Sequence, residues 1–207
     1  MMREEYLPWL FWAGAGFLLG GVMFCDILPR RLAGRDIRQD SDDHNPGAAN
    51  VFLLCGVPMG LLCLALDLLK GFLPVWLAKS SLDVRSLLFA GVIAAPVLGH
   101  GLGVLNHFHG GKCISTSFGV LAALIPESWI VLVLAALYIF FSTVVRVRPM
   151  RVRSMLVFAL FGLSSVWLLT SAGKDSLALG CLAVSAIAML RHRERKERPA
   201  RQRTAEL

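Results

Sequence analysis

The sequence lacks the features of a soluble or a disulfide-stabilised protein. Only 17% of its 207 residues are charged, and 56% are hydrophobic, against the ~45–50% apolar content of a typical soluble domain. Its five cysteines show no paired spacing, which argues against a disulfide framework. The N-terminus lacks the basic stretch and small-residue cleavage site of a secretory signal, so we expect the first apolar run to be retained.

Apolar runs recur along the whole chain instead. They predict an all-α polytopic membrane protein of about seven transmembrane helices, without a separate soluble domain. We place the spans at about 7–27, 51–78, 85–104, 114–126, 128–145, 154–171 and 174–190. The second run contains charges and helix breakers, which predicts a broken or partly surface-lying helix. The fourth is short, so we expect it to be tilted or half-inserted.

The basic residues are distributed unevenly between the two predicted membrane faces. Sixteen of the 21 lysines and arginines fall on the side that holds the C-terminus. Because cytoplasmic loops are enriched in Lys and Arg, the N-terminus is predicted outside and the C-terminus in the cytoplasm. The net charge of +7 is then a topology signal, not a sign of nucleic-acid binding. All five histidines fall in or beside the predicted cytoplasmic loops.

Four polar segments interrupt the apolar pattern. They are Ser41–Asn50, Asp67–Gly71, Gly99–Cys113 and Arg191–Lys196. Each has a plain structural interpretation: a solvated turn, an ion pair at i,i+3 spacing, glycines at a helix contact, and a basic tail. Intramembrane ionisable residues are nevertheless functional candidates, and a lysine after two glycines suggests an anion.

The glycine-rich segment matches no common phosphate or metal motif. It is not a P-loop, because Cys113 follows Lys112 where Ser or Thr is required. A zinc site could in principle draw on His100, His107, His109 and Cys113, but their spacing matches no compact zinc pattern. We therefore expect no metal in the site.

Taken in order, the four segments resemble the bacterial acyl-phosphate:glycerol-3-phosphate acyltransferases, the PlsY family. That family's first motif reads roughly Gly-Ser-Gly-Asn-x-Gly-Ala-Thr-Asn, with a basic residue three positions past its second asparagine. The others read Asp-x-x-Lys-Gly; Gly-His, then a Phe-Pro step, then Phe-x-Gly-Gly-Lys-Gly; and His-x-x-Asn. The resemblance covers about residues 8–195. The matching residues are Asn45, Gly47, Ala48, Asn50, Asp67, Lys70, Gly71, Gly99, His100, Phe108, Gly110, Gly111, Lys112 and His192.

The resemblance implies one membrane acyltransferase domain over 1–207, with a disordered basic tail at about 196–207. The family transfers a fatty acyl group from acyl phosphate to glycerol 3-phosphate and forms lysophosphatidate, a step of phospholipid synthesis. The implied partners are these two substrates and the lipid bilayer, with no cofactor and no nucleic acid. The implied location is the bacterial cytoplasmic membrane, with the active site on the cytoplasmic face.

The resemblance also implies the site residues. The expected catalytic residues are His192, Lys112 and Asn45. Lys112 and the N–H groups of Gly110 and Gly111 are expected to hold phosphate, and His192 to bind phosphate or act as a proton partner. The expected substrate-binding residues are Asp43, Gly47, Asn50, Asp67, Lys70, His100, Gly110, Gly111 and Arg195.

The sequence departs from the family pattern in each motif. Asp42-Asp43-His44 replaces Gly-Ser-Gly, Leu53 replaces a basic residue, Leu102-Gly103 replaces Phe-Pro, Cys113 replaces a glycine, and Arg195 replaces the closing asparagine. We expect Arg195 or Arg38 to compensate for the lost cation; the alternative, in which the aspartates hold a divalent cation, would be unusual for this family. Two alternatives stay open: a relative that acylates another acceptor, and a small-anion transporter, which would show an internal repeat that we do not see.

Overall fold

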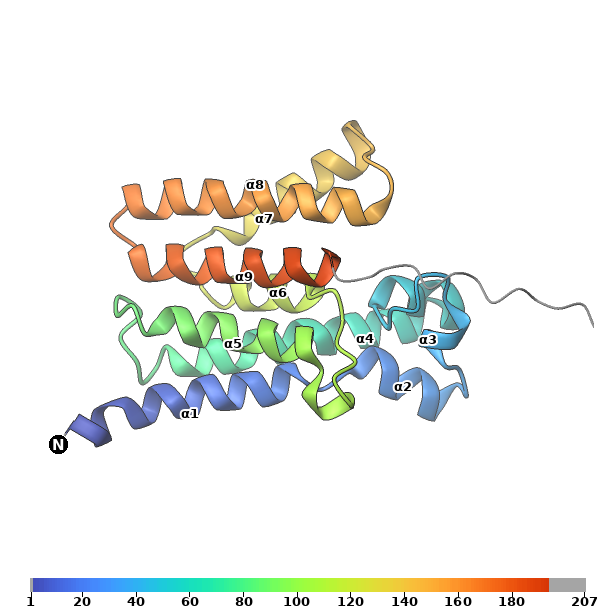
Figure 1. Ribbon diagram of the computed structural model, residues 1–207, viewed down its shortest axis with the longest axis horizontal. Coiled ribbons are helices and arrows are strands. Elements are labelled where there is room, and N and C mark those ends of the chain that lie inside the picture. The colour runs from blue at the N-terminus through green and yellow to red at the C-terminus, as the bar shows by residue number, and fades with distance from the viewer. Residues whose placement is uncertain (1, 194–207) are drawn as a thin grey trace, which may run out of the picture.

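The computed structural model describes residues 2–193, so Arg195 and the predicted tail at 196–207 lie outside the described residues. Every regular element among the described residues is helical (Figure 1). The elements are α1 (Met2–Gly20), α2 (Phe24–Leu32), α3 (Ile37–Asp40), α4 (Ala48–Ala78), α5 (Phe89–Leu102), the 3₁₀ helix η1 (Val104–Asn106), α6 (Ile114–Ala122), α7 (Val131–Ile139), the π-helix η2 (Phe140–Val144), α8 (Met150–Ser171) and α9 (Asp175–Arg193).

The first apolar run, predicted as a span at 7–27, is not one straight helix. The chain leaves α1 at Gly20 and enters α2 at Phe24, with a bend of 40° between the two helices. Between them the carbonyl of Val22 turns toward α4 and accepts a hydrogen bond of 2.5 Å from Nζ of Lys70. A polar contact with a buried lysine therefore accompanies the break, which hydropathy cannot reveal.

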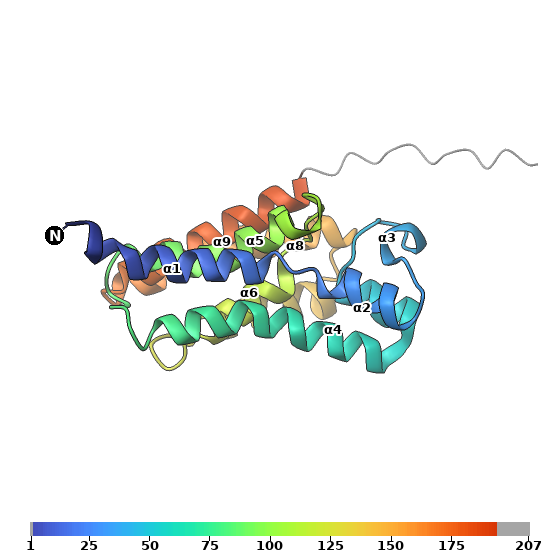
Figure 2. The same ribbon diagram turned by 90° about the horizontal axis from the view of Figure 1, so that it is seen from below.

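The second apolar run is broken, as the sequence predicts. Within the 31 residues of α4, Gly56 has φ of 81° and ψ of 178°, a backbone conformation that residues with a Cβ rarely adopt. The kink separates the first two turns of α4, which carry Asn50, from its longer remainder. The beginning of α4 lies with α2 and α3 at one end of the molecule (Figures 1 and 2).

The prediction of seven spans is not confirmed. Four helices among the described residues are long and apolar enough to cross a membrane, or five if α1 and α2 count as one bent span. The segments at 114–126 and 128–145 contain α6 and α7, which have nine residues each. A nine-residue helix is roughly 14 Å long, about half the thickness of the hydrocarbon core.

Glycines allow the helices to approach closely. A Cβ on Gly99 of α5 would overlap the carbonyl oxygen of Phe17 in α1, and one on Gly71 of α4 would overlap the carbonyl oxygen of Thr116 in α6. Small residues at such crossings are typical of membrane helix pairs. Gly71 and Gly99 match family motifs, and the structure gives them a packing role.

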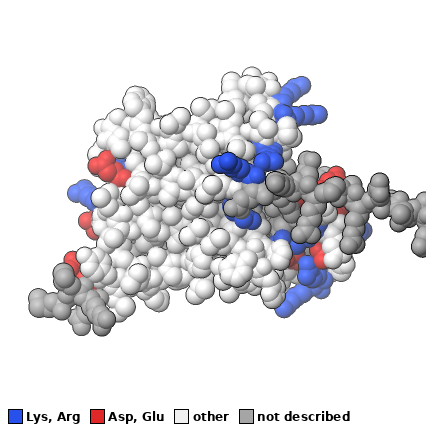
Figure 3. Space-filling model, viewed as in Figure 1, with Lys and Arg blue, Asp and Glu red and all other residues white. Residues whose placement is uncertain are grey.

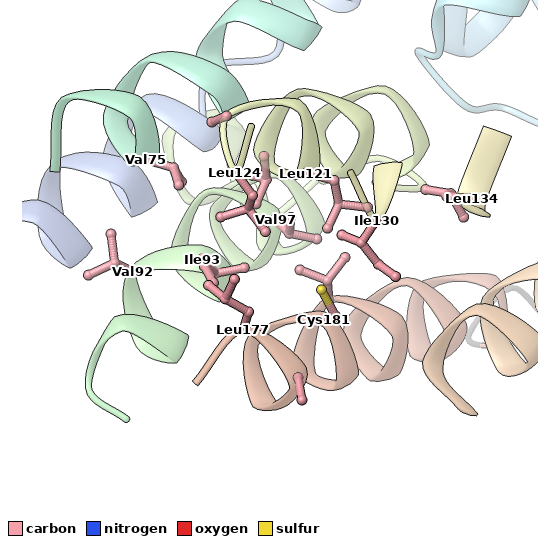
Figure 4. Packing of buried hydrophobic residues seen from close by; sticks show 14 of the residues in the cluster. Val75, Val92, Ile93, Val97, Leu121, Leu124, Ile130, Leu134, Leu177 and Cys181 are labelled. Carbon is pink, nitrogen blue, oxygen red and sulfur yellow. The ribbon is translucent and has the colours of Figure 1, made fainter. Parts of the chain in front are cut away.

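An apolar core joins α5, α6 and α9. Ile93 and Val97 of α5 pack near Leu121 of α6 and near Leu177 and Cys181 of α9 (Figure 4). All five residues are buried. The polar motifs lie outside this core, toward the end of the bundle that carries α2, α3 and the loop between α5 and α6.

Candidate functional site

The loop at 103–113 folds tightly against the end of α5. A Cβ on Gly110 would overlap the carbonyl oxygen of Gly101, and one on Gly111 would collide with the ring of His100. The N–H of Gly111 donates a 3.0 Å hydrogen bond to the carbonyl of His100. These glycines are therefore required by close packing, and the N–H of Gly111 is already used within the protein.

Lys112 joins this loop to the segment before α4. Its ammonium group forms an ion pair with one carboxylate oxygen of Asp43. The other oxygen of Asp43 accepts hydrogen bonds from Nδ2 of Asn50, at 2.7 Å, and from the N–H of Asn45, at 3.2 Å. Nδ2 of Asn50 also donates to the carbonyl of Asn45 at 2.7 Å. Four of the predicted site residues thus form one network.

The same network keeps Asp43 ionised. Burial raises the pKa of this carboxyl group, but the hydrogen bond and charge of Lys112, together with the donors from Asn50 and Asn45, outweigh burial. The net effect lowers the pKa of Asp43 below its ordinary value. At neutral pH the carboxylate therefore neutralises Lys112 within the structure.

The last turn of α9 brings His192 and Arg191 to the same place. His192 is 2% exposed, and its Nδ1 lies 2.8 Å from the carbonyl of Ala188, which assigns the Nδ1 proton to that bond. Its Nε2 is buried and has no hydrogen-bond partner among the described residues. Nε of Arg191 donates to the carbonyl of Gly111 at 3.4 Å. The positive charge of Lys112 is one of the charges that act electrostatically on the His192 ring.

Asp67 and Lys70 form the ion pair that their spacing predicts. Nζ of Lys70 lies 2.8 Å from Oδ1 of Asp67, and both side chains are almost fully buried. Lys70 also donates to the carbonyl of Val22, and Sγ of Cys25 donates to Oδ2 of Asp67 at 3.3 Å. Their observed partners are protein groups, so the pair fixes α4 to the α1–α2 break. Substrate contact by Asp67 or Lys70 stays a prediction.

Asp26 is a polar centre that the sequence analysis missed. It is 4% exposed and accepts hydrogen bonds from Arg30 at 3.2 Å, from Nε of Arg38 at 3.1 Å and from Nδ2 of Asn106 at 2.8 Å. Arg38 also donates to the carbonyl of His109. Arg38, expected to replace the cation absent at position 53, therefore supports the glycine loop. The spacing of Asp26 and Arg30 at i,i+4 was the available signal.

Ser154 is a second residue that the sequence analysis missed. Its Oγ is buried and faces the hydroxyl group of Tyr138. It lies one turn before Phe158 on α8, and the Phe158 ring lies 6.4 Å from the His192 ring, between centroids. A serine near the end of an apolar run gave no sequence signal.

The remaining predicted residues are placed as follows. Gly47 is the N-cap of α4, where the first turn of the helix has no side-chain cap. His100 is buried, and its Nδ1 has no hydrogen-bond partner among the described residues. Across residues 2–193 no group of three or more His, Cys, Asp or Glu side chains is arranged to hold a metal ion. The histidine–cysteine zinc hypothesis therefore has no geometric support.

The chain matches the sequence profile of the family described as glycerol-3-phosphate acyltransferase over residues 10–202. The protein belongs to this family. A glycerol-3-phosphate acyltransferase of Shewanella woodyi is 33% identical over 189 residues, which cover 87% of this chain and 84% of the relative. One of Syntrophomonas wolfei is 30% identical over 183 residues, which cover 88% of each chain.

Two crystal structures of PlsY, an integral membrane glycerol 3-phosphate acyltransferase, have the same fold. The glycerol 3-phosphate form matches with a TM-score of 0.76 at 29% identity, and the lysophosphatidic acid form with 0.74 at 27%. Each match covers 90% of this chain and 88% of the other. The protein is thus a multi-pass membrane acyltransferase, as the order of the motifs predicts, and these relatives give the transporter alternative no support.

Proposed function

We propose that the protein transfers a fatty acyl group from acyl phosphate to glycerol 3-phosphate and releases lysophosphatidate and inorganic phosphate. The observation that carries this proposal is the meeting of three segments at Lys112. The loop at 43–50 reaches Lys112 through Asp43, and the last turn of α9, which carries His192, reaches the neighbouring Gly111 through Arg191. Family membership supplies the reaction class.

The site offers the groups that a phosphate needs. Lys112 supplies a cation, and α4 begins at Gly47 with no side-chain cap, so no capping side chain occupies the N–H groups of its first turn. His192 supplies Nε2 as the free ring nitrogen, because Nδ1 is bound to Ala188. We assign Nε2 to a substrate phosphate, whose negative charge would favour the imidazolium form against the cations Lys112 and Arg191 near the ring.

The chemistry requires little from the protein beyond positioning. The primary hydroxyl oxygen of glycerol 3-phosphate attacks the acyl carbonyl carbon, the bond from that carbon to the phosphate oxygen breaks, and phosphate leaves with the electron pair. The hydroxyl proton goes to the departing phosphate, which keeps atoms and charge balanced. Because acyl phosphate is already activated, holding the two substrates and neutralising their phosphates supplies most of the rate enhancement.

The proposed topology places the active site on the cytoplasmic face of a bacterial cell membrane. It has the N-terminus outside and the C-terminus inside, with α6 and the α7–η2 segment completing seven crossings. In support, the start of α1 and the end of α9 lie at opposite ends of the molecule (Figure 1). Arginine and lysine side chains gather mainly at the site end (Figure 3), as cytoplasmic faces require.

A direct assay tests the proposal. Purified protein in vesicles receives acyl phosphate and glycerol 3-phosphate, with and without a chelator, and lysophosphatidate and released phosphate are measured. We expect equal amounts of both products and at least about a tenfold loss in His192→Gln, which removes one charge-assisted contact. His107→Gln, at an exposed loop histidine, is the matched control. Absence of product from the wild type would refute the proposal.

One observation favours a second candidate function, acylation of an uncharged polyol. Asp43 already neutralises Lys112, which weakens the attraction of the site for an acceptor phosphate. The same vesicles supplied with glycerol in place of glycerol 3-phosphate separate the two candidates. A larger kcat/KM for glycerol would favour the second candidate over the first.

A further inference from the structure

A cationic cavity lies where η2 meets the start of α8. It is a cavity of about 250 Å³ lined by Ser142, Arg146, Val147, Arg148 and Arg153. Its volume is roughly eight times that of a water molecule in the liquid, which leaves room for a phosphate group. No lining side chain is a carboxylate, so the cavity concentrates positive charge.

The three arginines have no acidic partner among the described residues. Nε of Arg146 donates to the carbonyl of Thr143 at 3.0 Å, which fixes the stem of that side chain and leaves its terminal nitrogens available. Nε of Arg153 is buried without a hydrogen-bond partner. Arg148 is exposed at the rim. Because Nε of Arg153 is closed to solvent, an anion in the cavity would be bound by the terminal guanidinium nitrogens of the lining arginines.

The surface around the cavity is apolar and exposed. Phe140, Val144 and Val145 along η2, and Met150 and Val152 on α8, are at least 40% exposed. In Figure 3, basic side chains project from the corner of the molecule at which Figure 1 places η2 and α8. Cations above an apolar strip fit a ligand that carries both a phosphate and acyl chains. A free phosphate ion would use only the cations.

We propose that this cavity binds the phosphodiester headgroup of an anionic bilayer lipid, with the acyl chains lying along η2. The cavity is separate from the acyltransferase site, because neither Lys112 nor His192 lines it. The cavity is nevertheless close to that site. In sequence, Ser154 follows Arg153; in the fold, Arg151 donates a hydrogen bond of 2.9 Å to the carbonyl of Arg193, the last residue of α9. A bound lipid would therefore brace the α7–α8 corner against α9.

Lipid retention by the full chain tests this site without any acyl transfer. The purified protein is equilibrated with equal amounts of phosphatidylglycerol and phosphatidylcholine in detergent, and bound lipid is measured by native mass spectrometry. We expect the wild type to retain phosphatidylglycerol preferentially. We expect Arg146→Ala/Arg148→Ala to reduce that retention about tenfold or more, because two charge-assisted contacts are lost.

The matched control is Arg31→Ala/Arg35→Ala, which removes two exposed arginines from the same end of the molecule but outside the cavity. It should retain phosphatidylglycerol as the wild type does, and both variants should keep the wild-type Tm in detergent without lipid. Equal losses in both variants would show general charge attraction and overturn the proposal. So would unchanged retention in the cavity variant, or displacement of phosphatidylglycerol by an equal concentration of inorganic phosphate or acyl phosphate.

Discussion

Two aspartate–lysine pairs in this protein have the same chemistry and different surroundings. Asp67 and Lys70 are three residues apart on α4, and their side chains are 3% and 1% exposed. Asp43 and Lys112 are 69 residues apart on two loops, and their side chains are 36% and 20% exposed. The first pair has further protein partners in Val22 and Cys25, whereas the second faces the candidate substrate site.

This difference separates a fixed pair from an exchangeable one. Removing one member of a buried pair leaves an uncompensated charge, so such a pair cannot open without a large cost. A partly exposed ion pair contributes only ~0–1 kcal/mol to stability, so a substrate phosphate can replace Asp43 on Lys112 at little cost. We therefore predict that the α4 pair contributes mainly to stability and, in line with the proposed function, that the loop pair exchanges with substrate.

The largest expected effect comes from breaking the buried pair. Lys70→Met leaves the Asp67 carboxylate buried without its cation, and we expect a loss of about 3–5 kcal/mol in the free energy of unfolding. Thermal unfolding in detergent measures this loss as a fall in Tm. The double variant Asp67→Asn/Lys70→Met should recover most of it. A single variant as stable as the wild type would contradict the structural role.

The next largest effect concerns activity. Lys112→Ala removes a charge-assisted contact to phosphate, worth about 1.5–3 kcal/mol, and we expect kcat/KM to fall roughly 10- to 150-fold while Tm changes little. Lys79→Ala is the matched control, because Lys79 is also a lysine in an ion pair, with Glu127. Comparable activity losses in the two variants would mean that Lys112 acts through the fold alone.

The same contrast shows what the sequence could predict. The i,i+3 spacing revealed the Asp67–Lys70 pair, since a helix fixes which side chains meet. The motif order brought Lys112 and His192 into one site, but only through the family resemblance. The sequence could not reveal the Asp43–Lys112 pair or Asp26, because these contacts join segments whose relative placement depends on tertiary packing.

The fold was predictable to a similar degree. Hydropathy located α8 and α9 and the kinked α4, because long apolar runs have few alternatives to a helix in lipid. Hydropathy placed the first span across the break at Gly21–Met23, where Lys70 donates a hydrogen bond to the carbonyl of Val22. It counted the α7–η2 region as a span and expected the short α6 segment to be tilted or half-inserted, and neither segment is among the helices long enough to cross a membrane, because composition does not report where a helix ends.

A smaller effect is expected from removing the internal competitor of the loop pair. Asp43→Asn keeps an oxygen for Asn50 and Asn45 but removes the charge that holds Lys112. We expect KM for glycerol 3-phosphate to fall several-fold, with little change in kcat or Tm. Initial rates at varied acceptor concentration measure this change. Asp40→Asn, at an exposed ion pair with Arg35, is the control. A higher KM in Asp43→Asn would show that Asp43 orients Lys112 for the substrate.

The smallest expected effect concerns pH: near neutrality, the effect of Asp43 on KM should not depend on pH. Because the folded state lowers the pKa of Asp43, the pair with Lys112 is complete above the ordinary carboxyl pKa and is lost only as pH falls through the lowered value. The ratio of KM between wild type and Asp43→Asn should therefore stay constant from about pH 6 to 8. Titration of the substrate phosphate affects both proteins equally and cancels in the ratio. A KM ratio that converges on one within this range would mean that Asp43 takes up a proton at the working pH of the enzyme. Asp43 would then not compete permanently with substrate phosphate for Lys112.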